Sequence, residues 1–116
     1  MNFTISRAAF FEALQLVVNV IERKQTLPIL SHLIGVAAGQ TISLTATDQE
    51  VEVKMTVAGA ETDLSITGEG QIAVPGRKLL DICKNLPTDS QIAVHTSDNR
   101  FTLSSGEFES QLATLS

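Results

Sequence analysis

The stretch Gln71–Pro87, QIAVPGRKLLDICKNLP, changes from one backbone pattern to another around a Pro-Gly pair. Its first four residues, Gln71 to Val74, have the alternating character of a strand. From Leu79 onward, apolar residues recur at steps of three and four, which is typical of an amphipathic helix. We expect this helix from about Gly76 to Asn85, because it must end before Pro87. The stretch therefore predicts a short strand that leads directly into a helix.

The N-terminus repeats this pattern. Phe3 to Ile5 alternates, Ser6 is a favoured residue at a helix start, and apolar residues follow at helical spacing from Arg7 to about Val20. The two strand-helix segments superimpose without a gap, which indicates an internal duplication. The matched positions are Phe3, Ile5, Phe10, Phe11, Glu12 and Ala13 with Ile72, Val74, Leu79, Leu80, Asp81 and Ile82.

Two segments downstream of the predicted helices also match each other. ISLTATDQEVEV, Ile42 to Val53, overlays IAVHTSDNRFTL, Ile92 to Leu103, with apolar residues, hydroxyl residues and an aspartate in register. Asp48-Gln49 and Asp98-Asn99 are turn residues between alternating runs. Each segment is therefore predicted to form a β-hairpin.

These repeats predict an α+β fold in a single domain, residues 1–116, of two pseudo-symmetric β-α-β-β-β units with two helices packed on antiparallel sheets. The length suits one domain, and two copies are too few for a solenoid. Further strands are expected at His32–Ala38, Val51–Val57 and Asp63–Gly70, which gives about eight in total. Both helices should cover one face of the sheets, with the other face in solvent.

The formal net charge of -5 argues against a general nucleic-acid binder, because phosphate contacts supply most sequence-independent affinity. It does not exclude a local basic face. Such a face would lie on the helices, whose outward positions are expected to be Arg7, Gln15, Asn19, Arg77, Asp81 and Lys84.

The single cysteine, Cys83, lies in the second predicted helix and cannot form an internal disulfide. We interpret it as a buried thiol in a reducing compartment. The N-terminus lacks the pattern of a signal peptide, and no apolar run is long enough to span a membrane. We therefore expect a cytoplasmic protein without a membrane partner.

No group of residues has the pattern of a catalytic or metal site. His32 and His95 have no Cys, Asp or Glu at ligand spacing, and a surface or hydrogen-bonded histidine is the favoured interpretation. Asp48, Glu50 and Glu52 alternate with valines, as on a solvated strand face. We expect no catalytic residue, no metal and no cofactor, and hence a non-enzymatic role.

Four segments in series resemble a known family. FTISR (3–7), TLPIL (26–30), ISLTATD (42–48) and VPGRKLLDICKNLP (74–87) are similar, in order and spacing, to the first domain of the bacterial DNA sliding clamp, the beta subunit of the replicative DNA polymerase III. The resemblance implies the DNA-clamp fold, in the first of three domains of a longer chain. It also implies a ring of two protomers joined head to tail, with helices around duplex DNA and sheets outside.

The function implied by this resemblance is that of a processivity factor, which slides on double-stranded DNA and tethers the polymerase. Basic groups on inner helices would contact phosphates without reading sequence, while acidic outer strands repel DNA. By resemblance, Lys24 stands where the family usually has an arginine, and Arg77 matches an inner-surface arginine. Lys84 is added because it lies two helical turns beyond Arg77; a solvated helix face is the alternative.

The resemblance implies that the ring closes along the last strand, Glu107 to Leu112, against a second protomer. Phe108 and Leu112 are expected on one side of this strand, with Lys78 nearby as a salt-bridge candidate. Glu107 and Glu109 stand where familiar members have basic residues, so either the partner edge is basic or these ion pairs are absent. The polymerase and the clamp loader are expected to bind the second and third domains.

An alternative of a different class is a β-rich protein-interaction module that does not meet DNA. Such a module would bind its partner through the Phe108 edge alone. Replacing Lys24 and Arg77 together by Glu would leave its activity intact, whereas a sliding clamp would show reduced loading or reduced DNA association.

Overall fold

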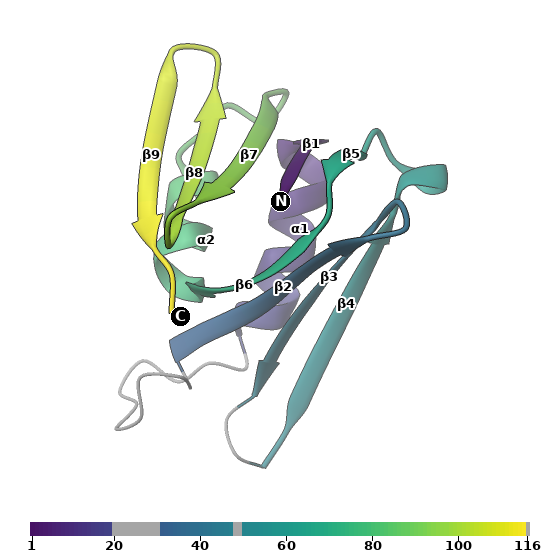
Figure 1. Cartoon of the computed structure of the whole chain (residues 1–116), viewed down its shortest axis with the longest axis vertical. Coiled ribbons are helices and arrows are strands. Elements are labelled where there is room, and N and C mark those ends of the chain that lie inside the picture. The colour runs from purple at the N-terminus through teal and green to yellow at the C-terminus, as the bar shows by residue number, and fades with distance from the viewer. Residues whose placement is uncertain (20–30, 48–49, 116) are drawn as a thin grey trace.

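The computed structural model describes residues 1–19, 31–47 and 50–115. These residues fold into two antiparallel sheets and two α-helices (Figure 1). One sheet has the strand order β5-β1-β7-β8-β9, and the other has the order β4-β3-β2-β6. The elements are β1 Asn2–Ser6, α1 Arg7–Val18, β2 His32–Ala38, β3 Thr41–Thr47, β4 Glu52–Ala58, the short 3₁₀ helix η2 Gly59–Glu61, β5 Ser65–Gly68, β6 Gly70–Pro75, α2 Gly76–Lys84, β7 Gln91–Ser97, β8 Arg100–Ser105 and β9 Phe108–Ala113. The expected α+β fold is confirmed, although the described residues form nine strands.

Helix α1 begins directly after Ser6, as the sequence predicts. The Ser6 Oγ accepts a hydrogen bond of 3.2 Å from the backbone N–H of Ala9, which caps the first helical turn. One stripe of the helix is buried, and within it the ring of Phe10 meets the ring of Phe3 edge to face at 5.9 Å between centroids. The helix ends at Val18, and the expected end at Val20 lies outside the described residues.

Helix α2 follows Pro75 and buries Leu79, Leu80 and Cys83. Asn85 caps the end of α2, because its backbone N–H and its side-chain amide both donate hydrogen bonds to carbonyl oxygens of the last helical turn. The amide Nδ2 donates to the carbonyl oxygen of Asp81 at 2.9 Å. The predicted helix from Gly76 to Asn85 is confirmed, with Asn85 as the residue that caps it.

The two sheets repeat one another. Strands β1-β7-β8-β9 correspond in order to β6-β2-β3-β4, with α1 corresponding to α2, and β5 is additional. The duplication of the strand-helix segments is therefore confirmed. The predicted overlay of the hairpins is wrong by one strand, because β3 corresponds to β8 and not to β7. Every arm of both meanders has the same alternating pattern, so sequence similarity alone did not determine which arms match.

The turns identify the correct correspondence. Gly39-Gln40, between β2 and β3, has φ values of 55° and 64°, and Asp98-Asn99, between β7 and β8, has 51° and 61°. Positive φ at both positions is the geometry of a type I′ hairpin turn. The second residue of each turn accepts a hydrogen bond through its carbonyl oxygen, from Gly59 at 2.8 Å and from Thr114 at 3.0 Å respectively. The counterpart of Asp98-Asn99 is therefore Gly39-Gln40, and the predicted counterpart Asp48-Gln49 lies outside the described residues.

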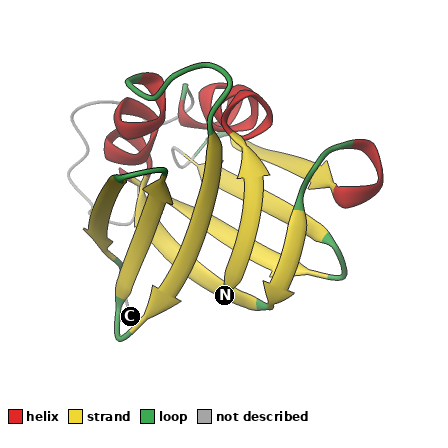
Figure 2. Ribbon diagram, turned by 90° about the horizontal axis from the view of Figure 1, so that it is seen from above, coloured by secondary structure: helices red, strands yellow, loops and turns green. Residues whose placement is uncertain are grey.

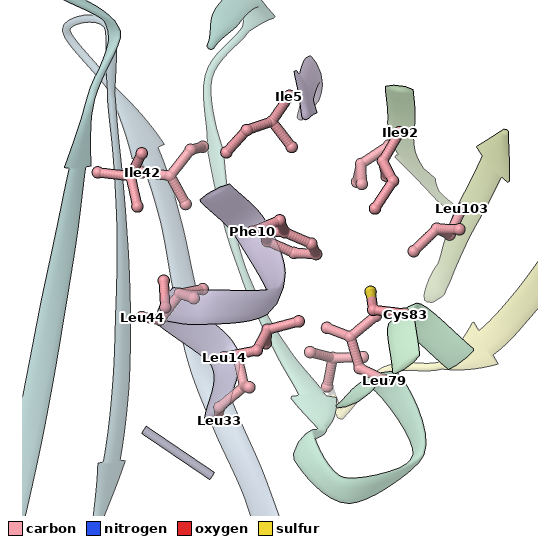
Figure 3. Packing of buried hydrophobic residues seen from close by; sticks show 14 of the residues in the cluster. Ile5, Phe10, Leu14, Leu33, Ile42, Leu44, Leu79, Cys83, Ile92 and Leu103 are labelled. Atoms are coloured by element: carbon pink, nitrogen blue, oxygen red, sulfur yellow. The ribbon is translucent and has the colours of Figure 1, made fainter. Parts of the chain in front are cut away.

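The core lies between the helices and the inner faces of both sheets (Figure 3). Ile42 in one sheet and Ile92 in the other point toward side chains of α1 and α2, among them Phe10 and Leu79. Both helices lie together on one side of the sheets, as expected (Figure 2). No helix in the described part of the chain is long and apolar enough to cross a membrane.

Candidate nucleic-acid interface and subunit edge

Positive charge is concentrated on the helices. The described residues of α1 and α2 include four cations, Arg7, Arg77, Lys78 and Lys84, against the carboxylates Glu12 and Asp81. The remainder of the described chain has the opposite balance. There the cations are Lys54 and Arg100, and the carboxylates with described side chains are Glu50, Glu52, Asp63, Glu69, Asp89, Asp98, Glu107 and Glu109.

Arg77 and Lys84 lie on the same face of α2. They are separated by two helical turns, and Asp81 lies between them along that face. Arg77 is half-buried, whereas Lys84 is exposed in the last turn. Two of the three predicted DNA-binding residues are thus placed on one surface, and the third, Lys24, lies outside the described residues.

Arg7, expected on the outward stripe of α1, is directed at the end of α2. Its Nε donates to the carbonyl oxygen of Cys83 at 3.0 Å, and its Nη2 donates to that of Lys84 at 3.3 Å. The guanidinium also lies 4.2 Å from the centre of the Phe11 ring. A cation at this position compensates the negative end of the α2 dipole. Arg7 therefore joins the two helices, and the outward positive charge of the helices comes from the other cations.

Strand β9 is a free edge of the five-stranded sheet. Phe108 and Leu112 lie on one side of the strand, as predicted. Leu112 pairs with the buried Phe101 of β8, so this is the helix side of the sheet. Glu109 projects to the outer face. The expected strand began at Glu107, but this residue lies in the turn that Gly106 opens with a φ of 58°. Glu107 is therefore a turn residue at the end of the edge rather than part of the strand.

A groove of about 310 Å³ separates β9 from α2. It is lined by Phe108 and by the α2 side of the chain, namely Asp81, Ile82, Asn85 and Leu86. Phe108 is 42% exposed, and with Ile82 and Leu86 it gives the groove an apolar part that is open to solvent. Lys78 is exposed one helical turn before Ile82, on the face that lines this groove. The predicted edge residues thus surround a partly apolar groove.

A second free edge, at β4, was not predicted as a site. By the internal repeat, β4 corresponds to β9, and its helix-facing residues Val53, Met55 and Val57 occupy the places of Phe108, Ser110 and Leu112. A groove of about 180 Å³ lies between β4 and α1, lined by Glu12 among others. The corrected register of the hairpins reveals this equivalence, which the sequence overlay had hidden.

Comparisons with a family model and with curated proteins all point to the same protein family. The family model described as "DNA polymerase III beta subunit, N-terminal domain" matches residues 1–116. This chain belongs to that family. The beta sliding clamp of Pseudomonas putida is 44% identical over 115 residues, which are 99% of this chain and 30% of that protein. The beta sliding clamp of Vibrio harveyi is 41% identical over 117 residues, with 77% of the compared protein covered.

Solved structures agree with the sequence comparisons. A crystal structure of a sliding clamp from Pseudomonas aeruginosa bound to griselimycin superimposes on this domain with a TM-score of 0.92 and 43% identity, covering 99% of this chain and 30% of the other. A beta subunit from Caulobacter crescentus gives 0.92 at 33% identity. This beta-subunit domain thus spans about a third of the length of most of these relatives.

The beta-subunit domain has a buried thiol in its helix layer. Burial raises the pKa of Cys83 to about 12, although the nearby Arg7 charge opposes this effect. The side chain is therefore a neutral part of the core at neutral pH. Across residues 1–19, 31–47 and 50–115, no three His, Cys, Asp or Glu side chains are grouped so that they could bind a metal ion.

Proposed function

We propose that this domain is the first of three in a protomer of a ring-shaped processivity factor. The ring encircles duplex DNA, slides on it and tethers the replicative polymerase through sequence-independent phosphate contacts. Family membership over residues 1–116 supports this role, as does the fact that relatives named beta sliding clamp are about three times longer. The replicative polymerase and a clamp loader would bind the domains that follow.

The observation that carries the DNA contact is the separation of charge between helices and sheets. Arg77 and Lys84 lie on one face of α2, whereas the strands and turns carry mostly carboxylates in the described chain. A helix-lined hole would then attract the phosphate backbone, and the outer surface would repel it. Contacts through a few cations at the protein surface are weak and screened by salt, which permits sliding. Lys24 would add a further phosphate contact.

The free edges of β9 and β4 support the ring. An exposed strand edge is normally covered by another chain or protected against pairing. The β9 edge with Phe108 and Leu112 would pair with the second protomer, head to tail, and Lys78 would supply an ion pair. The equivalent β4 edge would meet the next domain of the same chain. A unit with two equivalent edges can be linked on both sides, which ring closure requires.

The test uses the full-length polypeptide that contains this domain, loaded onto nicked circular DNA. We expect the protein to remain on the circle through gel filtration and to be lost after the circle is linearised, because enclosure rather than affinity retains it. Equal retention on circular and linear DNA would contradict the ring. If the protein is retained on neither circular nor linear DNA but still binds a protein partner, the interaction module is favoured.

A further inference from the structure

We infer that the β9 edge selects a partner strand that carries Lys or Arg opposite Glu107 and Glu109 and an apolar side chain for the groove beside Phe108. This inference rests on the proposed ring and specifies the chemistry of the partner edge. The partner is the second protomer, through a domain other than this one. Backbone geometry, the groove and the charge pattern each contribute to the inference.

The backbone of β9 can accept one further strand. A two-residue turn joins β8 to β9 and pairs Ser105 with Phe108. Because residues of an antiparallel pair alternate between facing and turning away from the partner, Glu109, Gln111 and Ala113 direct their backbone groups to the free side. Beyond them, Leu115 leaves this sheet and bridges to Ala73 of β6 with a hydrogen bond of 3.0 Å. The partner strand is therefore a short one that pairs alongside residues 109 to 113.

The groove supplies the anchor for this strand. Phe108 stands at its rim, and Ile82 and Leu86 form its apolar part. An apolar side chain of the partner strand that points to the helix side would enter the groove and cover Phe108. A buried apolar anchor that fills a pocket can supply a large part of the affinity at a protein interface.

The charges select which strand binds. Glu107 in the turn and Glu109 on the outer face are both exposed at the same end of the edge. At the opposite end, Arg100 pairs with Ala113 and also projects outward. The edge thus has acidic and basic ends, and a partner strand with the complementary order of charges is favoured over one with the reverse order. Asp81 on the groove wall and the exposed Lys78, one helical turn before it, carry opposite charges and leave this asymmetry in place.

The experiment measures protomer association of the full-length polypeptide by sedimentation equilibrium at low and high salt. With Glu107→Lys and Glu109→Lys together, we expect the dissociation constant at low salt to rise by about tenfold or more, because attraction becomes repulsion. The neutral pair Glu107→Gln and Glu109→Gln should instead lose most of the salt dependence. Glu69→Lys reverses one exposed charge next to β5, the opposite edge of the same sheet, and as a control it should leave association unchanged.

A second variant separates this inference from the proposed ring. Phe108→Ser removes the apolar anchor without changing charge, and it should weaken association at every salt concentration. If it does so while both charge variants associate like the parent, the inference is overturned and the β9 interface stands. If Phe108→Ser also has no effect, the β9 edge is not the ring interface. A tight dimer of the isolated 116-residue chain through β9 would also overturn the inference, since the occupant would then be a second β9 edge.

Discussion

The Nε of Arg7 donates a hydrogen bond of 3.0 Å to the carbonyl oxygen of Cys83, and so joins the first residue of α1 to the last turn of α2. The Nη2 of Arg7 donates a second hydrogen bond to the carbonyl oxygen of Lys84, and the guanidinium lies over the Phe11 ring. One side chain therefore orients the two helices that would form the DNA-facing layer. The geometry of that layer depends on a residue that makes no DNA contact in the proposed function.

Arg7→Ala should lower the free energy of unfolding by about 1–3 kcal/mol, because two carbonyl oxygens lose a charged donor and the Phe11 contact is lost. The free energy of unfolding of Arg7→Lys should lie between those of Arg7→Ala and the parent, because lysine keeps the charge but not the planar donor geometry. Urea denaturation of the 116-residue chain measures both. Lys54→Ala, an exposed strand residue, is the control and should change stability by no more than about 0.5 kcal/mol.

Stability should fall at alkaline pH because of Cys83. Its pKa is about 12 in the folded chain and 9.0 in the unfolded reference, so the folded state keeps the proton longer. The stabilising contribution is fully present below about pH 9 and is lost as the pH rises toward 12. Between pH 8 and pH 10 we expect a loss on the order of 1 kcal/mol from this group. We expect Cys83→Ala to be less stable than the parent at pH 7 and to lack that part of the pH dependence. Urea titrations of variant and parent at each pH measure both effects.

Asp63 should stabilise the domain at neutral pH and not in acid. The Gln91 side chain, which donates to its Oδ2 at 2.5 Å, and the Ser6 backbone N–H, which donates to its Oδ1 at 2.9 Å, hold its pKa below the usual value. A lowered pKa means that this contribution is present above the unfolded pKa and disappears as the pH falls through the folded pKa. Asp63→Asn should therefore differ from the parent at pH 7 and converge with it in acid, as seen by thermal unfolding. A difference that persists at pH 2 would contradict this account.

The proposed DNA contact predicts a change in salt dependence. In the full-length polypeptide, Arg77→Glu with Lys84→Glu should weaken DNA association and flatten its dependence on salt, because each phosphate contact contributes about 0.9 to the logarithmic slope. Lys54→Glu, which reverses a single charge on the outer sheet face, is the control and should not change that slope. The isolated domain should bind DNA very weakly, since it supplies few contacts and no enclosure. Tight, salt-resistant binding by the isolated chain would argue against this interpretation.

The helices and most strands could be predicted because local signals agree there. Ser6 before an amphipathic run and Pro75-Gly76 before another mark the two helix starts, and each helix begins where those residues place it. Alternation identified the strands, but it also made every strand of the meanders look alike. Alternation alone does not show which strand of one repeat corresponds to which strand of the other, so the predicted overlay of the two hairpins was wrong.

The remaining features depend on contacts between distant residues. The spacing of Arg7 and Phe11 by four residues permits a cation-ring contact, but nothing local shows that Arg7 reaches the end of α2. Glu107 alternates correctly with Phe108 and Glu109, yet Gly106 with positive φ moves the turn so that the strand starts one residue later. The β4 groove was missed because an edge becomes visible only when the sheet order is known.

The position of β1 has a consequence for the order in which the domain folds. This first strand pairs on one side with β5 and on the other with β7, whose residues come more than 80 positions later in the chain. Strands β2, β3 and β4 pair with near neighbours and can form early, whereas β1 pairs with β5 on one side and completes its pairing only with β7, in the last third of this domain. A nascent chain that stalls before β7 would leave the β7 side of β1 unpaired, and an unpaired strand edge favours aggregation. Synthesis of the C-terminal part is thus the step that protects the N-terminal part.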